Sequence, residues 1–164
     1  RTPTMDAEDI KVAHGCAKQL LADADTQVEV PGLGDRTPRL LSRQALAGVI
    51  EPRVEEIFQL VQQVIRDSGF EELLSSGVVL TGGSAVMPGM VELGEDIFLK
   101  PVRRGVPKYS RALSDMVAQP RAATVMGLME EARAARLRGY KVAQKTGGVQ
   151  SAFGRLRDFI VGNF

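Results

Sequence analysis

Two glycines after a short apolar run are the first feature of the sequence with a chemical use. Gly77-Val-Val-Leu80 has the pattern of a strand buried on both faces, and Thr81-Gly82-Gly83-Ser84 follows it directly. Glycines let a planar or phosphorylated ligand approach the backbone, and exposed amides can donate to phosphate or ribose oxygens. A tight turn without any ligand has the same pattern, so the glycines alone leave both interpretations open.

Glu8 and Lys11 form a second candidate pair, because a spacing of three residues places a carboxylate and an ammonium on one helix face. A solvated surface pair and a ligand-binding pair both fit this spacing, and Lys11 could also approach a phosphate as a point charge. The lone His14 has no metal-ligating residues around it and is interpreted as a packing or capping residue. The sequence therefore predicts no metal site, and no catalytic residue can be assigned.

The composition is that of a soluble globular domain, with 164 residues, 44% hydrophobic and 25% charged. A formal net charge of +1 argues against bulk nucleic-acid binding. The single cysteine, Cys16, excludes an internal disulfide and is expected in the core. No stretch approaches the roughly 20 apolar residues of a membrane span. The chain begins at Arg1 without an initiator Met, so we expect that residues before it are missing.

The hydrophobic pattern predicts helices alternating with short strands, which indicates an α/β protein. The first expected elements are a helix over Asp6–Ala22 capped by Thr4 or Asp6 and a hairpin of Thr26–Val30 and Arg39–Leu41. A helix should then begin at Ser42, be kinked or restarted at Pro52 and end near Ser68-Gly69. The remaining elements are the strand at Gly77–Leu80, a helix over Pro88–Phe98, an edge strand at Pro101–Gly105 and a helix over Ala122–Leu137. The turn after Leu80 would then lie between a strand and a helix, where α/β sheets bind ligands.

The end of the sequence differs from the rest in composition. Residues 139–148 read as a flexible linker that ends in paired glycines. On a helical wheel the last segment places its large apolar residues on one side, namely Val149, Ala152, Phe153, Leu156, Phe159, Ile160 and Phe164. Ser151 and Asp158 fall on the opposite side, and Arg155 and Arg157 flank the apolar stripe, where their stems can snorkel to headgroups.

This arrangement is typical of a helix that lies in a membrane interface. From Arg133 onward seven basic residues stand against Asp158 alone, although the whole chain has a net charge of only +1. Anionic lipid attracts such a tail by about 1 kcal/mol for each charge close to the surface. The alternative is a helix that packs on its own domain or on a partner protein.

The string Gly77–Met90, which includes Pro88-Gly89, closely resembles the adenosine motif of the actin and Hsp70 superfamily. Further strings narrow the resemblance to the FtsA family over essentially the whole chain; these are Ile10–Gly15, Val28–Pro31, Val49–Arg53, Ile97-Phe98 with Pro101–Arg103, Leu113–Asp115 and Gln119-Pro120. FtsA proteins are actin-like ATP-binding proteins that tie the bacterial division ring to the cytoplasmic membrane.

The resemblance implies the C-terminal half of an actin-like (ribonuclease H-like) ATPase fold, with a small inserted subdomain and a C-terminal amphipathic helix. Residues 1–60 would be the small subdomain beside the nucleotide cleft and residues 61–138 the larger subdomain with the adenosine motif. Residues 139–148 would be a linker, and residues 149–164 would be the membrane-targeting helix. Half a cleft exposes surfaces that normally meet the missing half, so we expect the isolated chain to be marginally soluble.

The resemblance also implies three sets of binding residues. Those for the nucleotide are Glu8, Lys11, Gly82, Gly83 and Ser84. Those for the acidic C-terminal tail of FtsZ are Arg36, Arg39, Arg43 and Arg53, unless these arginines only keep the surface soluble. Those for the membrane are Phe153, Arg155, Leu156, Arg157, Phe159, Ile160 and Phe164.

The implied cofactor is ATP with Mg²⁺ in the complete protein, because the family's phosphate loops and catalytic acid lie upstream of this chain. The chain alone is therefore not expected to be an enzyme. Implied partners are FtsZ, anionic membrane, further copies in actin-like polymers and later division proteins, at the cytoplasmic face of the inner membrane at the septum. The alternatives are another actin-superfamily scaffold, for shape determination or pilus assembly, and a sugar-kinase-like enzyme.

Overall fold

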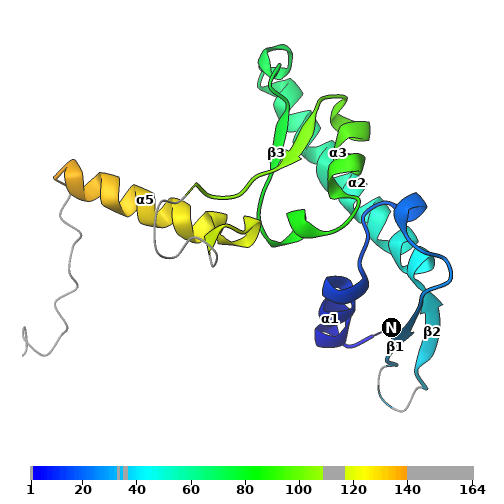
Figure 1. Ribbon diagram of the computed structural model, residues 1–164. Coiled ribbons are helices and arrows are strands. Elements are labelled where there is room, and N and C mark those ends of the chain that lie inside the picture. Colours follow the sequence, from blue (N-terminus) through cyan, green and yellow to red (C-terminus); the bar gives the residue numbers. More distant parts are fainter. Residues whose placement is uncertain (1, 33, 35–36, 109–116, 140–164) are drawn as a thin grey trace, which may run out of the picture. The chain divides into compact units, whose positions relative to one another are not determined.

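The computed structural model (Figure 1) describes residues 2–32, 34, 37–108 and 117–139. Its helices are α1 (Thr4–His14), α2 (Arg43–Asp67), α3 (Met90–Phe98) and α5 (Ala123–Leu137), and its strands are β1 (Gln27–Val30), β2 (Arg39–Ser42), β3 (Val78–Leu80) and β4 (Val102–Arg104). Short 3₁₀ turns are η1 (Gln19–Leu21), η2 (Glu71–Leu73), η3 (Gly83–Val86) and η4 (Pro120–Ala122). This mixture of helix and strand agrees with the α/β prediction. The chain divides into two units, 1–126 and 127–164, and α5 crosses their boundary.

The first helix is shorter than the predicted Asp6–Ala22, because α1 ends at His14. Gly15 leaves the helix with an extended ψ of 145°, and the next amides have distant acceptors: Ala17 N–H donates to Pro88 O and Gln19 N–H to Glu51 Oε2. These tertiary hydrogen bonds replace the helical ones. The predicted cap at Thr4 or Asp6 is also wrong, since Pro3 holds the N-cap position and no side chain caps the helix.

The predicted hairpin is confirmed, with β1 and β2 antiparallel and Val28 opposite Leu41. Val28 and Val30 are buried while Gln27 and Glu29 are exposed, which is the alternation of a strand with one covered face. The hairpin leads directly into α2 (Figure 1), whose first turn is capped by the Ser42 hydroxyl accepting from Ala45 N–H at 3.1 Å.

Of the two predictions for Pro52, a kink or a restart of the helix, the restart is wrong, because α2 runs through this residue as one helix. A proline inside a helix removes one hydrogen bond and costs about 3 kcal/mol. Buried side chains on both sides of it, Ala47 before and Val54 and Phe58 after, are anchored in the two hydrophobic clusters of the fold. This packing holds the helix together across the proline.

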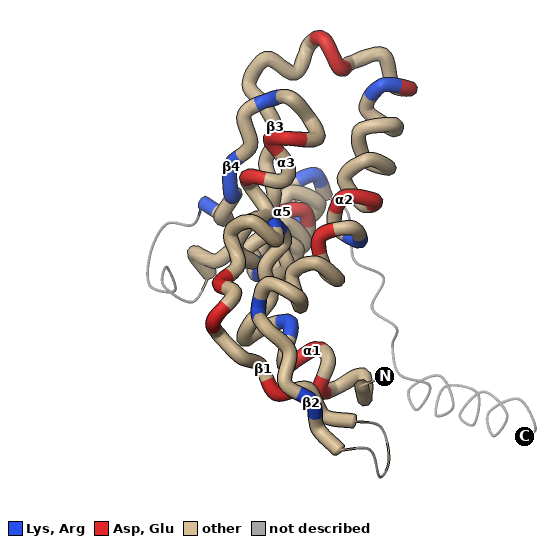
Figure 2. Tube along the Cα trace, turned by 90° about the vertical axis from the view of Figure 1, so that its right-hand side faces the viewer, with Lys and Arg blue, Asp and Glu red and all other residues tan. Residues whose placement is uncertain are grey.

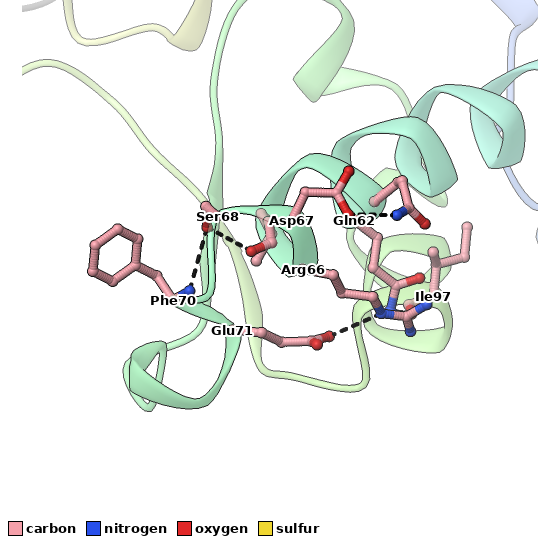
Figure 3. Close-up of polar contacts among 9 residues, drawn as sticks. Gln62, Arg66, Asp67, Ser68, Phe70, Glu71 and Ile97 are labelled. Atoms are coloured by element: carbon pink, nitrogen blue, oxygen red, sulfur yellow. Dashed lines mark hydrogen bonds and ion pairs between the residues drawn. The ribbon is translucent and has the colours of Figure 1, made fainter.

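The helix ends where the sequence predicted, at Ser68, and Gly69 follows with a φ of +74°. Figure 3 shows how polar groups close this end. Ser68 Oγ donates to Ile65 O at 2.5 Å and accepts from Phe70 N–H at 3.3 Å. One turn earlier, Gln62 Nε2 donates to the carbonyl of Ile97 at 2.8 Å and fixes α2 against the end of α3.

The strands β3 and β4 are parallel neighbours joined through α3, with Val79 opposite Arg103. The core between this βαβ unit and α2 is centred on Phe58 and Phe98, whose ring centroids are 5.3 Å apart. Its other buried members are Ala17, Val54, Met90, Leu93 and Val102. The predicted helix face of Met90, Leu93 and Ile97 is thus confirmed, although α3 begins at Met90 rather than at Pro88.

The strand β3 is not buried on both faces as predicted. Val78 and Leu80 pack against the core, but the Val79 side chain between them is 47% exposed. The second face of the apolar run is therefore only partly covered in the described part of the chain. Cys16, by contrast, is fully buried as expected, beside Ala22 and Ala47.

The last described element, α5, confirms the predicted helix within one residue. Within the described ranges, no helix combines the length and the apolar character needed to cross a membrane. Arg36, Leu113–Asp115, nearly all of the predicted linker and the whole predicted amphipathic helix at 149–164 lie outside the described residues.

Candidate functional site

A pocket of about 310 Å³ lies between α1 and the glycine turn after β3. It is lined by Glu8, Lys11, Val12, Gly15, Gly83, Ser84, Val86, Met87, Pro88 and Arg121. The two motifs that the sequence singled out, separated by some seventy residues, thus form opposite sides of one cavity. Four of the five predicted nucleotide-binding residues line it, and Gly82 is the N-terminal neighbour of Gly83.

The α1 side of the pocket presents one charged pair. Lys11 Nζ lies 2.5 Å from Glu8 Oε2, and the two side chains are 38% and 59% exposed. The pair is an i,i+3 contact on one helix face, as the spacing predicted. Its carboxylate can accept from hydroxyl or amino groups, and its ammonium can donate to an anionic group.

The glycine side is an open turn that is hydrogen-bonded to Gly105, which follows β4, and to Pro120 of η4. Gly82 has a φ of +94°, which favours glycine, and its N–H donates to Pro120 O at 3.0 Å. Thr81 Oγ1 lies 3.2 Å from Gly105 O and 3.3 Å from Pro120 O. A Cβ at Gly82 or Gly83 would meet no atom within 4 Å, so the turn faces open space that a ligand can fill.

The two sides meet at a tight junction between the loop after α1 and the start of α3. Ala17 N–H donates to Pro88 O at 2.8 Å. Gly89 has a φ of +83°, and a Cβ there would lie 2.7 Å from Lys18 N. Lys18 Nζ lies 2.5 Å from Asp96 Oδ2, and this hydrogen bond raises the pKa of the Lys18 ammonium. The absence of a side chain at Gly89 lets the two backbones approach this closely.

Sequence reasoning missed the apolar lining of Val12, Val86 and Met87 and the charge of Arg121. The string Gln119-Pro120 is part of the family resemblance, but no local pattern indicates that the next residue, Arg121, reaches a pocket that also contains Glu8 and Gly83. The hydrogen bonds of Pro120 with the glycine turn are what bring Arg121 to the pocket. Long-range pairing of this kind has no signature in a single sequence.

The arginines expected to meet FtsZ are in different surroundings. Arg39 is exposed on β2, whereas Arg43 Nε donates to His14 O at 3.1 Å and so binds the C-terminal end of α1. Arg53 is ion-paired with Glu56 on α2. Figure 2 shows acidic and basic residues interspersed along these elements. Arg36 and the predicted membrane residues Phe153–Phe164 lie outside the described residues.

The pocket can bind a small polar molecule by one carboxylate, two cations and bare backbone. The residues that the structure describes contain no group of three or more His, Cys, Asp or Glu side chains suited to a metal ion.

The chain matches the family model described as cell division protein FtsA over residues 1–127. It is 53% identical to the cell division protein FtsA of Pseudomonas aeruginosa over 79% of the chain and 31% of that protein. It is 41% identical to the FtsA of Neisseria meningitidis over 100% of the chain and 41% of that protein, and 39% identical to that of Escherichia coli K12 over 97% and 40%.

All of these relatives are cell division proteins, and that is the class of the present chain. It belongs to the FtsA family. The chain spans about 31–41% of the length of these relatives. The family assignment replaces the alternatives of a sugar-kinase-like enzyme or another superfamily scaffold.

Proposed function

We propose that the chain is the C-terminal part of an actin-like, ATP-binding division protein that anchors the FtsZ ring to the cytoplasmic membrane. The observation that carries the nucleotide part is the pocket itself. It joins Glu8 and Lys11 with Gly83 and Ser84, two motifs that the family resemblance relates to the nucleotide. In this proposal the nucleoside lies on the open glycine turn and its hydroxyl groups face the Glu8 carboxylate.

The binding site for ATP with Mg²⁺ would be completed by the remainder of the full protein. The pocket supplies surfaces for base and ribose, while the described residues gather no carboxylate cluster for Mg²⁺. When bound, ATP supplies a phosphate chain whose clamps we assign to the part upstream of Arg1. Residues of this chain bind and orient the nucleoside, and no hydrolytic step is assigned to them.

Gly83 offers a direct test, because a Cβ there meets nothing within 4 Å and its φ is ordinary. Gly83→Val should fold as the parent does but place its side chain in the space of the ligand. We expect ADP affinity to fall at least roughly tenfold, the order that a displaced ligand contact costs. Gly127→Val is the control, since Gly127 also has open space around it but is not a lining residue of the pocket. Equal ADP binding by both variants, measured by NMR titration, would contradict the site.

The hairpin and the start of α2 would form the FtsZ-binding side, through attraction of its acidic tail by Arg36, Arg39, Arg43 and Arg53. Arg39 is the best placed of these arginines. It is exposed, and no carboxylate of the described residues lies within ion-pair distance of it. Arg39→Glu should weaken binding of an FtsZ tail peptide, measured by fluorescence anisotropy, and Arg103→Glu on β4 should not. An unchanged anisotropy curve for Arg39→Glu would remove this residue from the interface.

The terminal segment, residues 149–164, would bind the membrane. Its residues segregate into an apolar side that includes Phe153, Leu156, Phe159, Ile160 and Phe164 and a flank with Arg155 and Arg157. The match to the Neisseria relative covers the whole chain, so this segment belongs to the shared sequence. One such helix binds reversibly, and polymerisation of the globular part would add avidity. The proposal places the protein at the cytoplasmic face of the inner membrane at the septum, where it would recruit later division proteins.

Sedimentation with phosphatidylglycerol liposomes tests the tether. The 164-residue chain should pellet with the liposomes, more weakly at high salt, and a chain ending at Gly148 should stay in the supernatant. Phe159→Glu on the apolar side should abolish pelleting, whereas Ser151→Glu on the polar side should change it little. Equal pelleting of the full and shortened chains would show that the segment is not a membrane anchor.

A further inference from the structure

Arg121 is a pocket residue whose position is fixed by the glycine turn. The residue before it, Pro120, is buried and accepts hydrogen bonds from Gly82 N–H at 3.0 Å and from Thr81 Oγ1 at 3.3 Å. The backbone of η4 is thus attached to the turn, and the next residue, Arg121, lines the same pocket as Gly83. Attachment of this kind keeps an exposed side chain near one place without burying it.

The charges of the lining make Arg121 different from Lys11. Lys11 is already paired with Glu8 at 2.5 Å. Among the described residues, no carboxylate forms an ion pair with Arg121. The N–H edge of the guanidinium is therefore not engaged in a fork with a carboxylate of the described residues and can orient toward a ligand.

The surface beside Arg121 suits a flat ring better than a phosphate. Gly82 and Gly83 leave open space above the backbone, and Val86 and Met87 add apolar lining. The turn η3 has only four residues, which is too short to present a helix N-terminus to an anion. An arginine that lines the same pocket as an open glycine turn and apolar side chains can stack on an aromatic ring placed there.

We propose that Arg121 is a ligand-contacting residue that stacks on the purine ring and holds it against the Gly82–Gly83 turn. This assignment rests on the nucleotide site proposed above. It makes binding of the base dependent on a residue outside both sequence motifs, and it separates recognition of the base from recognition of the phosphates.

The test is titration of the 164-residue chain with adenosine and, separately, with ATP, followed by NMR. Arg121→Ala should weaken adenosine roughly three- to thirtyfold and ATP by a similar factor, as expected for one lost cation–π contact. Arg121→Lys should also weaken adenosine, because it keeps the charge but not the planar group. Arg103→Ala, at an exposed arginine of β4, is the control and should bind as the parent does. Melting curves check that each variant is folded.

The other outcomes are distinct. A loss for ATP with unchanged adenosine affinity would make Arg121 a phosphate contact and overturn the stacking proposal. Unchanged affinity for both ligands would remove Arg121 from the site while leaving the nucleotide pocket intact. Failure of the parent chain to bind adenosine or ATP would overturn the nucleotide site itself, and the proposal for Arg121 with it.

Discussion

The two sides of the pocket are built in opposite ways. The glycine side continues into α3, a nine-residue helix that buries Met90, Leu93, Gly94 and Phe98. The opposite side is α1, which has eleven residues and buries none of them. One side of the site is therefore part of the hydrophobic core, while the other depends on a few polar and backbone contacts.

An eleven-residue helix without buried side chains is marginal by itself in water. A few tertiary contacts attach α1 to the fold, among them Arg43 Nε with His14 O and, beyond the helix, Ala17 with Pro88 and Lys18 with Asp96. Segments with few buried contacts open at a lower free energy than the core. We expect α1 to open without unfolding of α3, and ligand bound between them to reduce that opening.

The largest effect should come from the core side. Phe98→Ala removes a ring that packs 5.3 Å from Phe58 and should lower the free energy of unfolding by about 3–5 kcal/mol. Val12→Ala on α1, where the side chain is 76% exposed, should cost well under about 1 kcal/mol. Urea unfolding measures both. Similar losses for the two variants would show that α1 is packed as tightly as α3.

The junction between the two sides should be the next most sensitive place. Gly89→Ala and Gly69→Ala both put a side chain at positive φ, a strain of about 1–2 kcal/mol. At Gly89 the new Cβ would also lie 2.7 Å from Lys18 N, whereas at Gly69 it meets nothing within 4 Å. Thermal unfolding should therefore show a clearly larger loss for Gly89→Ala. If Gly69→Ala is as damaging, the junction is not tight.

A smaller effect is expected at the start of α2. Ser42→Ala removes the hydroxyl that accepts from Ala45 N–H and should cost about 1 kcal/mol of stability in urea unfolding. Ser42→Asp keeps an acceptor at the N-cap and should restore most of that stability. A destabilised Ser42→Asp variant would show that the loss has another cause.

The smallest effect concerns the Lys18–Asp96 pair and depends on pH. The pair raises the pKa of Lys18 above its ordinary 10.5, so its stabilising contribution is complete below that pH and disappears as pH rises through the folded-state pKa. Lys18→Met should melt slightly below the parent at about pH 8, and the gap should narrow at about pH 11.5. A gap that stays constant over this range would assign the effect to packing rather than to charge.

The sequence predicted those elements whose signals are local. Ser42 and Ser68-Gly69 marked both ends of α2, and alternation marked the hairpin. The end of α1 was missed because the amides of Ala17 and Gln19 are taken by acceptors far along the chain.

Two further errors have the same origin. Pro52 is a strong local signal for a break, but burial on both sides of it outweighs that signal. An apolar run such as Val78–Leu80 indicates a buried strand, yet only its first and last residues pack on the described core. Each pocket motif could be recognised because its own residues are close in sequence, whereas Arg121 belongs to neither motif and reaches the pocket only through the fold.

Hydrogen exchange of α1 and α3, with and without ADP, tests most directly whether the ligand binds between a core-anchored side and a loosely held side. Amides of α1 should exchange much faster than those of α3 in the free chain, and ADP should slow α1 more than α3. Equal protection of the two helices without ligand, or an α1 that exchanges equally fast with saturating ADP, would contradict the account.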